Sequence, residues 1–197
     1  VEMMSPLFES LVKNSLTVLA DEPDDSTAMV WSEAEAFAEM ESSEKAIYKL
    51  DLIDKEVLLE DVEDLLTYEG FHKVKELWLD KNEFKDEGVE VLAQSSQIKN
   101  LMVLSLAHNK LSNYSAQALA ASPFLGHLQK LFLQSNRIGL EGLKALTESP
   151  VLANLQLLYL NLNPVGPAGA GILGGDSKIK NLRELYLQKT GLGIEGV

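Results

Sequence analysis

Four aromatic side chains recur at one position of a 27-residue spacing: Trp78, Phe132, Tyr159 and Tyr186. Each stands between two apolar residues of a short alternating segment, so it points away from the side that those residues bury. Exposed aromatic rings are suited to anchoring a partner, because they bury a large area on contact. We expect the four rings to form a broken column on one face, interrupted by Ser105.

Polar side chains flank this column and would set its specificity. Glu76, Lys130 and Glu184 precede it by two residues, and the residues that follow it by two are Asp80, Gln134, Asn161 and Gln188. A purely structural interpretation stays open beside the binding one: stacked rings on neighbouring strands also stabilise a sheet.

No comparable pattern of residues indicates catalysis. His72, His108 and His127 fall at different positions of the 27-residue spacing and cannot converge repeatedly with acidic residues, and the chain has no cysteine. The glycine-rich run 166–175 lacks the Gly-Lys-Ser/Thr ending of a phosphate loop, and it predicts a poor, flexible helix instead. We therefore expect no catalytic residue, no metal site, no cofactor and no small-molecule substrate.

Six copies of one sequence pattern predict the strands that position the column. The pattern L-x-x-L-x-L, with other apolar residues at some positions, begins at Ile47, Val74, Leu101, Leu128, Leu155 and Leu182. A fixed period of this length predicts a solenoid, in which each alternating segment is a short strand of one parallel sheet.

A further polar position follows each strand. It holds the residues Lys55, Asn82, Asn109, Asn136, Asn163 and Thr190. A buried amide both donates and accepts, so the four asparagines can form a structural ladder that satisfies backbone groups of neighbouring turns. Lysine offers no acceptor and threonine replaces the amide poorly, and both lie in the outermost repeats, where atypical units are expected.

The second half of each repeat favours a helix. Runs such as 89–93 and 116–120 are helix-forming, and Ser122-Pro123 and Ser149-Pro150 predict where helices end. Strands stack about 4.8 Å apart, whereas packed helices need about 8–10 Å. The sequence thus predicts an α/β solenoid curved into an arc, with a parallel β-sheet on the concave face and helices on the convex face.

Residues 1–46 do not follow the repeat and predict an N-terminal helical cap. Ser5-Pro6 favours a helix running to about Ala20, and a second helix is expected from about Ser26 to Met40. We expect this cap to cover the open edge of the first strand, with residues 47–197 forming the repeat domain. The sixth repeat is truncated, so we expect the chain to continue or a partner to bury this end.

The extended line L-x-x-L-x-L-x-x-N-x-L resembles the leucine-rich repeat, and the repeat length and helix resemble its ribonuclease-inhibitor-like subclass. Residues 19–25, Val30-Trp31 and Ala46-Ile47 resemble the short helical companion segment that precedes such repeats in some bacterial proteins. The resemblance implies a non-enzymatic module that binds a protein partner. Two alternatives are a GTPase regulator resembling Ran GTPase-activating proteins and an inhibitor resembling ribonuclease inhibitor, although the latter family is cysteine-rich.

The charge is unevenly distributed along the chain. The net charge is −13, of which residues 1–70 carry −15 (19 acids, 4 lysines) and residues 71–197 carry +2 (11 acids, 13 bases). The acidic end suits a basic partner or simply a solvated surface. The chain is acidic and has only two arginines, so we expect no nucleic-acid ligand. No apolar run is long enough for a membrane span, so we expect no membrane partner. The absence of cysteine favours a cytoplasmic or other intracellular location.

Overall fold

A computed structural model describes residues 5–19, 47–175 and 177–193. The second expected helix, between about 26 and 40, lies outside these described residues, as does the end of the sixth repeat. Within them, no helix has the length and apolar character needed to cross a membrane.

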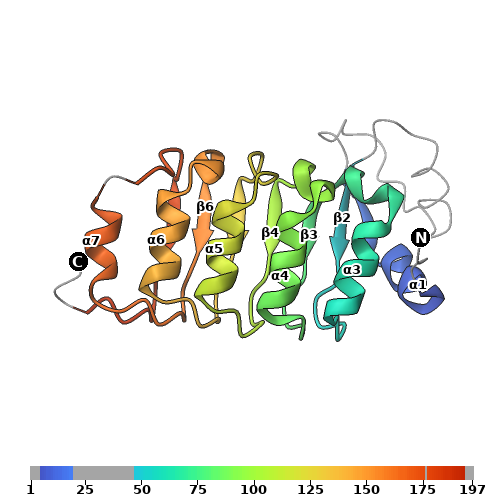
Figure 1. The fold of residues 1–197 in the computed structure, drawn as a ribbon, viewed down its shortest axis with the longest axis horizontal. Coiled ribbons are helices and arrows are strands. Elements are labelled where there is room, and N and C mark those ends of the chain that lie inside the picture. Colours follow the sequence, from blue (N-terminus) through green and yellow to red (C-terminus); the bar gives the residue numbers. More distant parts are fainter. Residues whose placement is uncertain (1–4, 20–46, 176, 194–197) are drawn as a thin grey trace, which may run out of the picture.

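One seven-stranded sheet runs through the molecule, with its strands in chain order (Figure 1). The strands are β1 (Leu16–Leu19), β2 (Ile47–Asp51), β3 (Val74–Trp78), β4 (Val103–Ser105), β5 (Lys130–Phe132), β6 (Leu157–Tyr159) and β7 (Glu184–Tyr186). Strands β2 to β7 are parallel, and from β3 onward each residue pairs with the residue 27 positions later, as Leu104 does with Leu131. This register confirms the predicted α/β solenoid.

Helices cover one face of this sheet (Figure 1). They are α1 (Pro6–Asn14), α3 (Leu59–Thr67), α4 (Lys85–Gln94), α5 (Asn113–Ala121), α6 (Leu140–Glu148) and α7 (Gly169–Leu173), with short 3-10 helices η1 (Glu69–Lys73), η2 (Ser96–Asn100) and η3 (Val151–Asn154). Helices α5 and α6 end at Ala121 and Glu148, and their C-cap residues Ser122 and Ser149 stand directly before the two prolines, as the sequence predicts. Leucines from strands and helices, such as Leu104, Leu119 and Leu131, are fully buried between the two layers.

The N-terminal segment is only partly helical. Helix α1 ends at Asn14, so the expectation of a helix to Ala20 is wrong: Leu16–Leu19 forms β1, antiparallel to β2. The strand forms because β2 would otherwise expose unpaired backbone groups at the edge of the sheet. Thr17 and Val18 also favour extended backbone. Phe8 and Val12 of α1 are buried against the core.

Pairing with β1 also changes the first repeat. In the next four repeats the first apolar residue of the line is buried, as with Val74 and Leu128, but Ile47 is half-exposed and Tyr48 is buried instead. The register between β2 and β3 shifts at Tyr48 and Lys49. Regular alternation along β2 thus places Tyr48 in the core, where the repeat pattern had pointed to Ile47.

Buried asparagines connect consecutive repeats. The Oδ1 of Asn136 accepts hydrogen bonds from the backbone N–H groups of Asn109 and Leu111, both at 3.0 Å. Its Nδ2 donates to the carbonyls of Leu106 at 3.0 Å and Leu133 at 2.9 Å. Asn82, Asn109 and Asn163 make corresponding contacts. Each amide therefore joins the turn of its own repeat to the turn before it.

The two outermost residues of this position behave differently. Lys55 only donates its backbone N–H to Asn82 Oδ1, at 3.2 Å. The hydroxyl of Thr190 donates to the Leu187 carbonyl at 2.7 Å, which reproduces the bond that an asparagine makes within its own repeat.

The residue before each position of the ladder has a left-handed backbone conformation, with positive φ. Its φ lies between 56° and 61° in Asp54, Lys81, His108, Ser135, Leu162 and Lys189, none of which is glycine. The N–H groups of Lys81 and His108 donate to the carbonyls of Ala107 and Gln134 in the next repeat. The inter-repeat ladder therefore holds these residues in a conformation that L-amino acids rarely adopt.

Two helix glycines, Gly142 and Gly171, differ in how closely other side chains pack around them. A Cβ on Gly142 would lie 2.5 Å from Ile138 Cγ2, whereas one on Gly171 would meet nothing within 4 Å. We expect Gly142→Ala to lower the free energy of unfolding by about 1–3 kcal/mol through overpacking. We expect Gly171→Ala to raise it by about 0.5–1 kcal/mol, because alanine favours helix. Urea unfolding of both variants measures this, and equal effects would refute it.

Candidate functional site

The strand positions that point away from the helices form the open sheet face. Its central line carries Trp78, Phe132, Tyr159 and Tyr186, here called the aromatic row, and each of these side chains is half-buried. The centroids of Phe132 and Tyr159 are 5.0 Å apart, and those of Tyr159 and Tyr186 are 4.0 Å apart with their planes within 9°. The rings of Phe132, Tyr159 and Tyr186, on adjacent parallel strands, therefore stack on one another.

The expected interruption at Ser105 does not occur. Trp78 and Phe132 lie on β3 and β5, which are not neighbours, yet their centroids are only 5.4 Å apart. Ser105 between them is fully buried, and its small side chain lets the two rings lean together above it. The expectation of a broken column is thus wrong, and the aromatic row is continuous.

Stacking gives the row a structural role without hiding it. Each ring contact on a sheet contributes about 0.5–1.5 kcal/mol beyond the buried area. The rings remain half-exposed, however, and their stacked faces leave edges and hydroxyl groups at the surface.

Tyr186 ends the row as a neutral hydrogen-bond donor. Its hydroxyl donates to Glu184 Oε2 at 3.0 Å. The hydroxyl of Tyr159 and the carboxylate of Glu184 together raise the pKa of Tyr186 to about 12, because both favour its protonated form.

Asp80 lies beside the row, partly buried on the open sheet face. Its Oδ1 accepts hydrogen bonds from Ser105 Oγ at 2.5 Å and from the backbone N–H of Ala107 at 2.8 Å. Burial raises the pKa of the Asp80 carboxyl above its ordinary 3.8, and Asp51 raises it further, whereas the two hydrogen bonds act in the opposite direction.

The raised pKa of Asp80 predicts a pH-dependent stability. The folded chain binds this proton more tightly than the unfolded chain, so this group's contribution to stability falls as the pH rises from below 3.8 through the raised value. In Asp80→Asn this fall disappears. We expect the stability of the variant relative to wild type to increase over that range and to stay constant above it. Urea unfolding between about pH 3 and pH 7 measures the difference, and a constant difference would contradict the assignment.

The amides on the same side of the row are less well paired. The side-chain oxygens of Gln134 and Asn161 are buried and accept no hydrogen bond from the described residues, whereas Gln188 is exposed. Buried acceptors without a donor are rare and carry a desolvation cost. Two of the four expected specificity residues thus have side-chain acceptors that no described residue uses.

Sequence reasoning missed the basic residue beside Trp78. Lys49 Nζ lies 4.7 Å from the centroid of the indole ring and 3.0 Å from Asp51 Oδ2. Trp78 Nε1 donates to Glu76 Oε2 at 3.2 Å. The strand register could have revealed the group, because Lys49 pairs with Glu76 and Asp51 pairs with Trp78.

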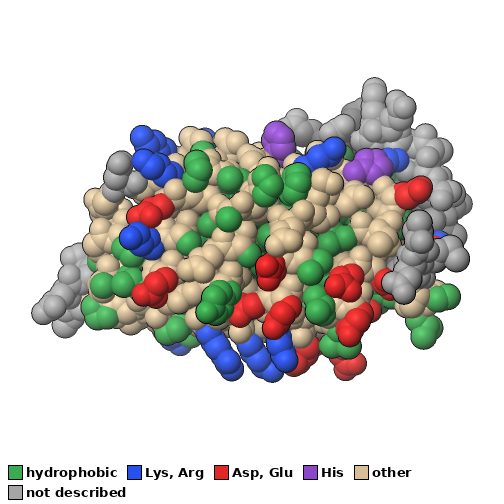
Figure 2. All heavy atoms as spheres, in the orientation of Figure 1, with side chains coloured by type: hydrophobic (Ala, Val, Ile, Leu, Met, Phe, Trp, Pro, Cys, Tyr) green, Lys and Arg blue, Asp and Glu red, His purple; other side chains and the backbone are tan. Residues whose placement is uncertain are grey.

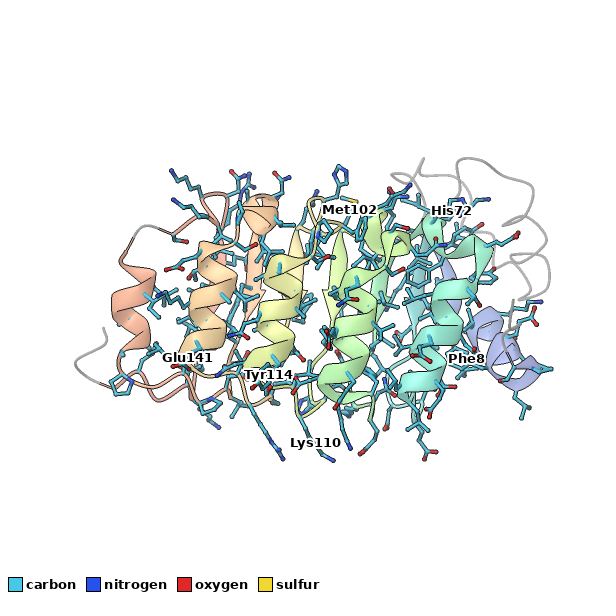
Figure 3. All side chains as sticks on the ribbon, in the orientation of Figure 1. Phe8, His72, Met102, Lys110, Tyr114 and Glu141 are labelled. Atoms are coloured by element: carbon cyan, nitrogen blue, oxygen red, sulfur yellow. The ribbon has the colours of Figure 1, made fainter. Side chains whose placement is uncertain are left out.

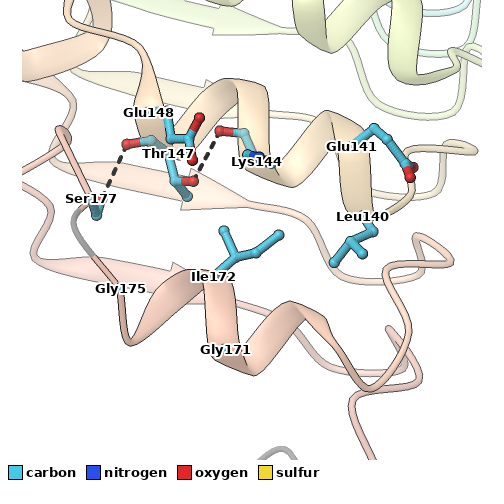
Figure 4. Close-up of a pocket in the computed structure, with 9 residues that line it drawn as sticks. All are labelled: Leu140, Glu141, Lys144, Thr147, Glu148, Gly171, Ile172, Gly175 and Ser177. Carbon is cyan, nitrogen blue, oxygen red and sulfur yellow. Dashed lines mark hydrogen bonds between the residues drawn. The ribbon is translucent and has the colours of Figure 1, made fainter.

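The helical side has a different character. Acidic side chains gather there over α3 and α4 (Figure 2), and Tyr114 of α5 stands out with 76% of its surface exposed (Figure 3). A hollow of about 550 Å³ opens between α6 and α7, where Gly171 and Gly175 leave Ile172 facing Leu140 (Figure 4). Helix α7 has only five residues, in line with the poor helix expected from the glycine-rich run.

Among residues 5–19, 47–175 and 177–193, no group of three or more histidine, aspartate or glutamate side chains is arranged to hold a metal ion. The hollow between α6 and α7 lies on the helical side, away from the aromatic row.

Comparison with known proteins supports the repeat assignment. A family model described as Leucine Rich repeat matches residues 72–93 and 127–146, which include β3 with most of α4 and β5 with most of α6. No curated protein matches the chain. The two matches and the 27-residue register of the strands together identify an α/β leucine-rich-repeat solenoid.

Proposed function

We propose that this chain is a non-enzymatic recognition module that binds a protein partner on the open sheet face. Leucine-rich repeats generally mediate protein–protein interaction. The observation that carries the proposal is the continuous row of four half-exposed rings across β3 to β7. A contiguous apolar surface of this kind is costly to leave in water unless a partner covers it.

Trp78, Phe132, Tyr159 and Tyr186 serve as the anchors in this proposal. Because the rings are already held by one another, they lose little side-chain entropy when a partner binds. Such rigid, half-buried aromatic residues are typical of positions where binding energy concentrates.

The polar side chains beside the row select the partner. Asp80, Gln134, Asn161 and Gln188 bring carboxylate and amide groups to the same position of four repeats, and Ala107 takes this position in the repeat between Asp80 and Gln134. In this proposal, donors of a partner backbone bond the side-chain oxygens of Gln134 and Asn161, which accept no hydrogen bond from the described residues.

The open sheet face can be tested against the helical side by affinity capture. Wild type, the triple variant Trp78→Ala/Phe132→Ala/Tyr159→Ala and the control Tyr114→Ala serve as baits in lysate of the source cells, at a temperature where all three are folded. We expect one protein to bind wild type and Tyr114→Ala but not the triple variant. Equal capture by all three baits would exclude the open sheet face as the binding site.

A further inference from the structure

A cation already sits on the ring at the N-terminal end of the aromatic row. Lys49 Nζ lies over the Trp78 ring, 4.7 Å from its centroid, and Asp51 Oδ2 holds the same ammonium at 3.0 Å. Phe132 approaches Trp78 from the β5 side, with the two ring centroids 5.4 Å apart. The ring face toward β2 is thus used as a cation-binding surface within the free chain.

Negative charge around Trp78 exceeds what Lys49 neutralises. Three carboxylates belong to this end of the open sheet face: Asp51 pairs with Trp78 across the strands, Glu76 accepts from its Nε1, and Asp80 follows Trp78 by two residues. The three acids carry three negative charges and Lys49 carries one positive charge, so two negative charges remain. Lys49–Asp51 is the ion pair present here among the described residues. The site is therefore complementary to an additional or stronger cation.

Lys49 holds this place weakly. Its side chain is 30% exposed and that of Asp51 is 38% exposed, so water screens both the ion pair and the contact with the ring. A lysine on a flexible stem also loses rotamer freedom by staying there. An incoming guanidinium, which stacks on an indole and bonds carboxylates through its planar fork, can displace it.

We propose that Trp78, Asp51, Glu76 and Asp80 form a subsite for a lysine or arginine side chain of the protein partner, which Lys49 occupies in the free protein. The inference rests on the proposed function, since it names the chemistry of that partner at one end of the aromatic row. A metal ion is a poor fit, because no group of three acidic or histidine side chains in the described residues has metal-binding geometry.

The test uses two peptides with blocked ends that differ only in charge: alternating glycine and arginine, and the same peptide with citrulline replacing arginine. Binding is followed by NMR through the indole N–H signal of Trp78, assigned by its loss in Trp78→Phe. We expect the arginine peptide to shift this signal and the citrulline peptide to leave it unchanged. Equal responses to both peptides, or none to either, would overturn the subsite.

Lys49→Gln separates displacement from general attraction. If Lys49 is seated over the ring for half to nine-tenths of the time, its removal tightens peptide binding about two- to tenfold. Lys55→Gln makes the same change in net charge in the same repeat, at an exposed position beyond β2, and serves as the matched control. The displacement idea fails if Lys49→Gln binds no more tightly than Lys55→Gln.

The peptide test is independent of the capture experiment. If peptides do not bind while capture still depends on the aromatic row, the cation subsite is wrong and partner recognition stands. If the arginine peptide binds at Trp78 while capture is the same for all baits, Trp78 binds cations, but its assignment to the captured partner and the proposed recognition surface are wrong.

Discussion

Asn136→Leu should lower the free energy of unfolding by about 3–5 kcal/mol, the largest single-residue effect that we expect in this chain. The asparagine side chain satisfies the N–H groups of Asn109 and Leu111 and the carbonyls of Leu106 and Leu133. Leucine has a similar volume but bonds none of them. Each buried group left without a partner costs about 1–3 kcal/mol, and relaxation of the turn offsets part of the sum.

An exposed asparagine provides the matched control for this prediction. Asn154 Nδ2 also donates to a carbonyl of the preceding repeat, that of Gly126 at 2.7 Å, but at the surface, where water can replace the bond. We expect Asn154→Ala to cost about 0.5–1.5 kcal/mol. Urea unfolding followed by circular dichroism compares the two, and a loss in Asn136→Leu no larger than in Asn154→Ala would refute the role of the ladder.

The sequence predicted the repeats, the buried leucines and the ladder positions because one physical constraint recurs every 27 residues. A residue such as Leu131 has to be apolar, because it is buried in the same layer of side chains as the matching residues of the repeats on either side. Asn82 and Asn163 were likewise recognisable, since a buried turn needs one side chain that both donates and accepts.

The N-terminal segment escaped prediction because its structure depends on a partner element rather than on its own pattern. Leu16–Leu19 is short enough to continue a helix, and only the open edge of β2 makes it a strand. The same pairing places Tyr48 in the core. The left-handed residues were equally invisible, since side chains such as Leu162 give no local signal of the turn that the inter-repeat hydrogen bonds impose.

On the open sheet face, sequence spacing predicted which residues share a surface but not how they touch. Trp78 meets Phe132 across a whole strand because the side chain of Ser105 is small, and that contact depends on how far each ring can lean. The strand register shows that Lys49 is near Trp78, but the contact itself depends on side-chain reach, since the ammonium extends diagonally across the strands.

The second large effect concerns binding rather than stability. We expect Phe132→Ala and Tyr159→Ala each to weaken binding of the captured partner by more than about 1 kcal/mol, while both variants remain folded. Some stability is also lost, because Tyr159 contacts the rings of Phe132 and Tyr186, and each such contact contributes about 0.5–1.5 kcal/mol. Affinities are therefore measured by calorimetry well below the lowest melting temperature of the set.

Tyr159→Phe distinguishes the ring from its hydroxyl. This variant keeps the stack with Phe132 and Tyr186 but removes the group that bonds Tyr186. If the rings are the anchors, its affinity stays near that of wild type, while the double variant Phe132→Ala/Tyr159→Ala loses less than the sum of the single losses, because the two side chains are in contact. Unchanged affinity in the alanine variants, with only their stability reduced, would mean that the aromatic row serves the sheet alone.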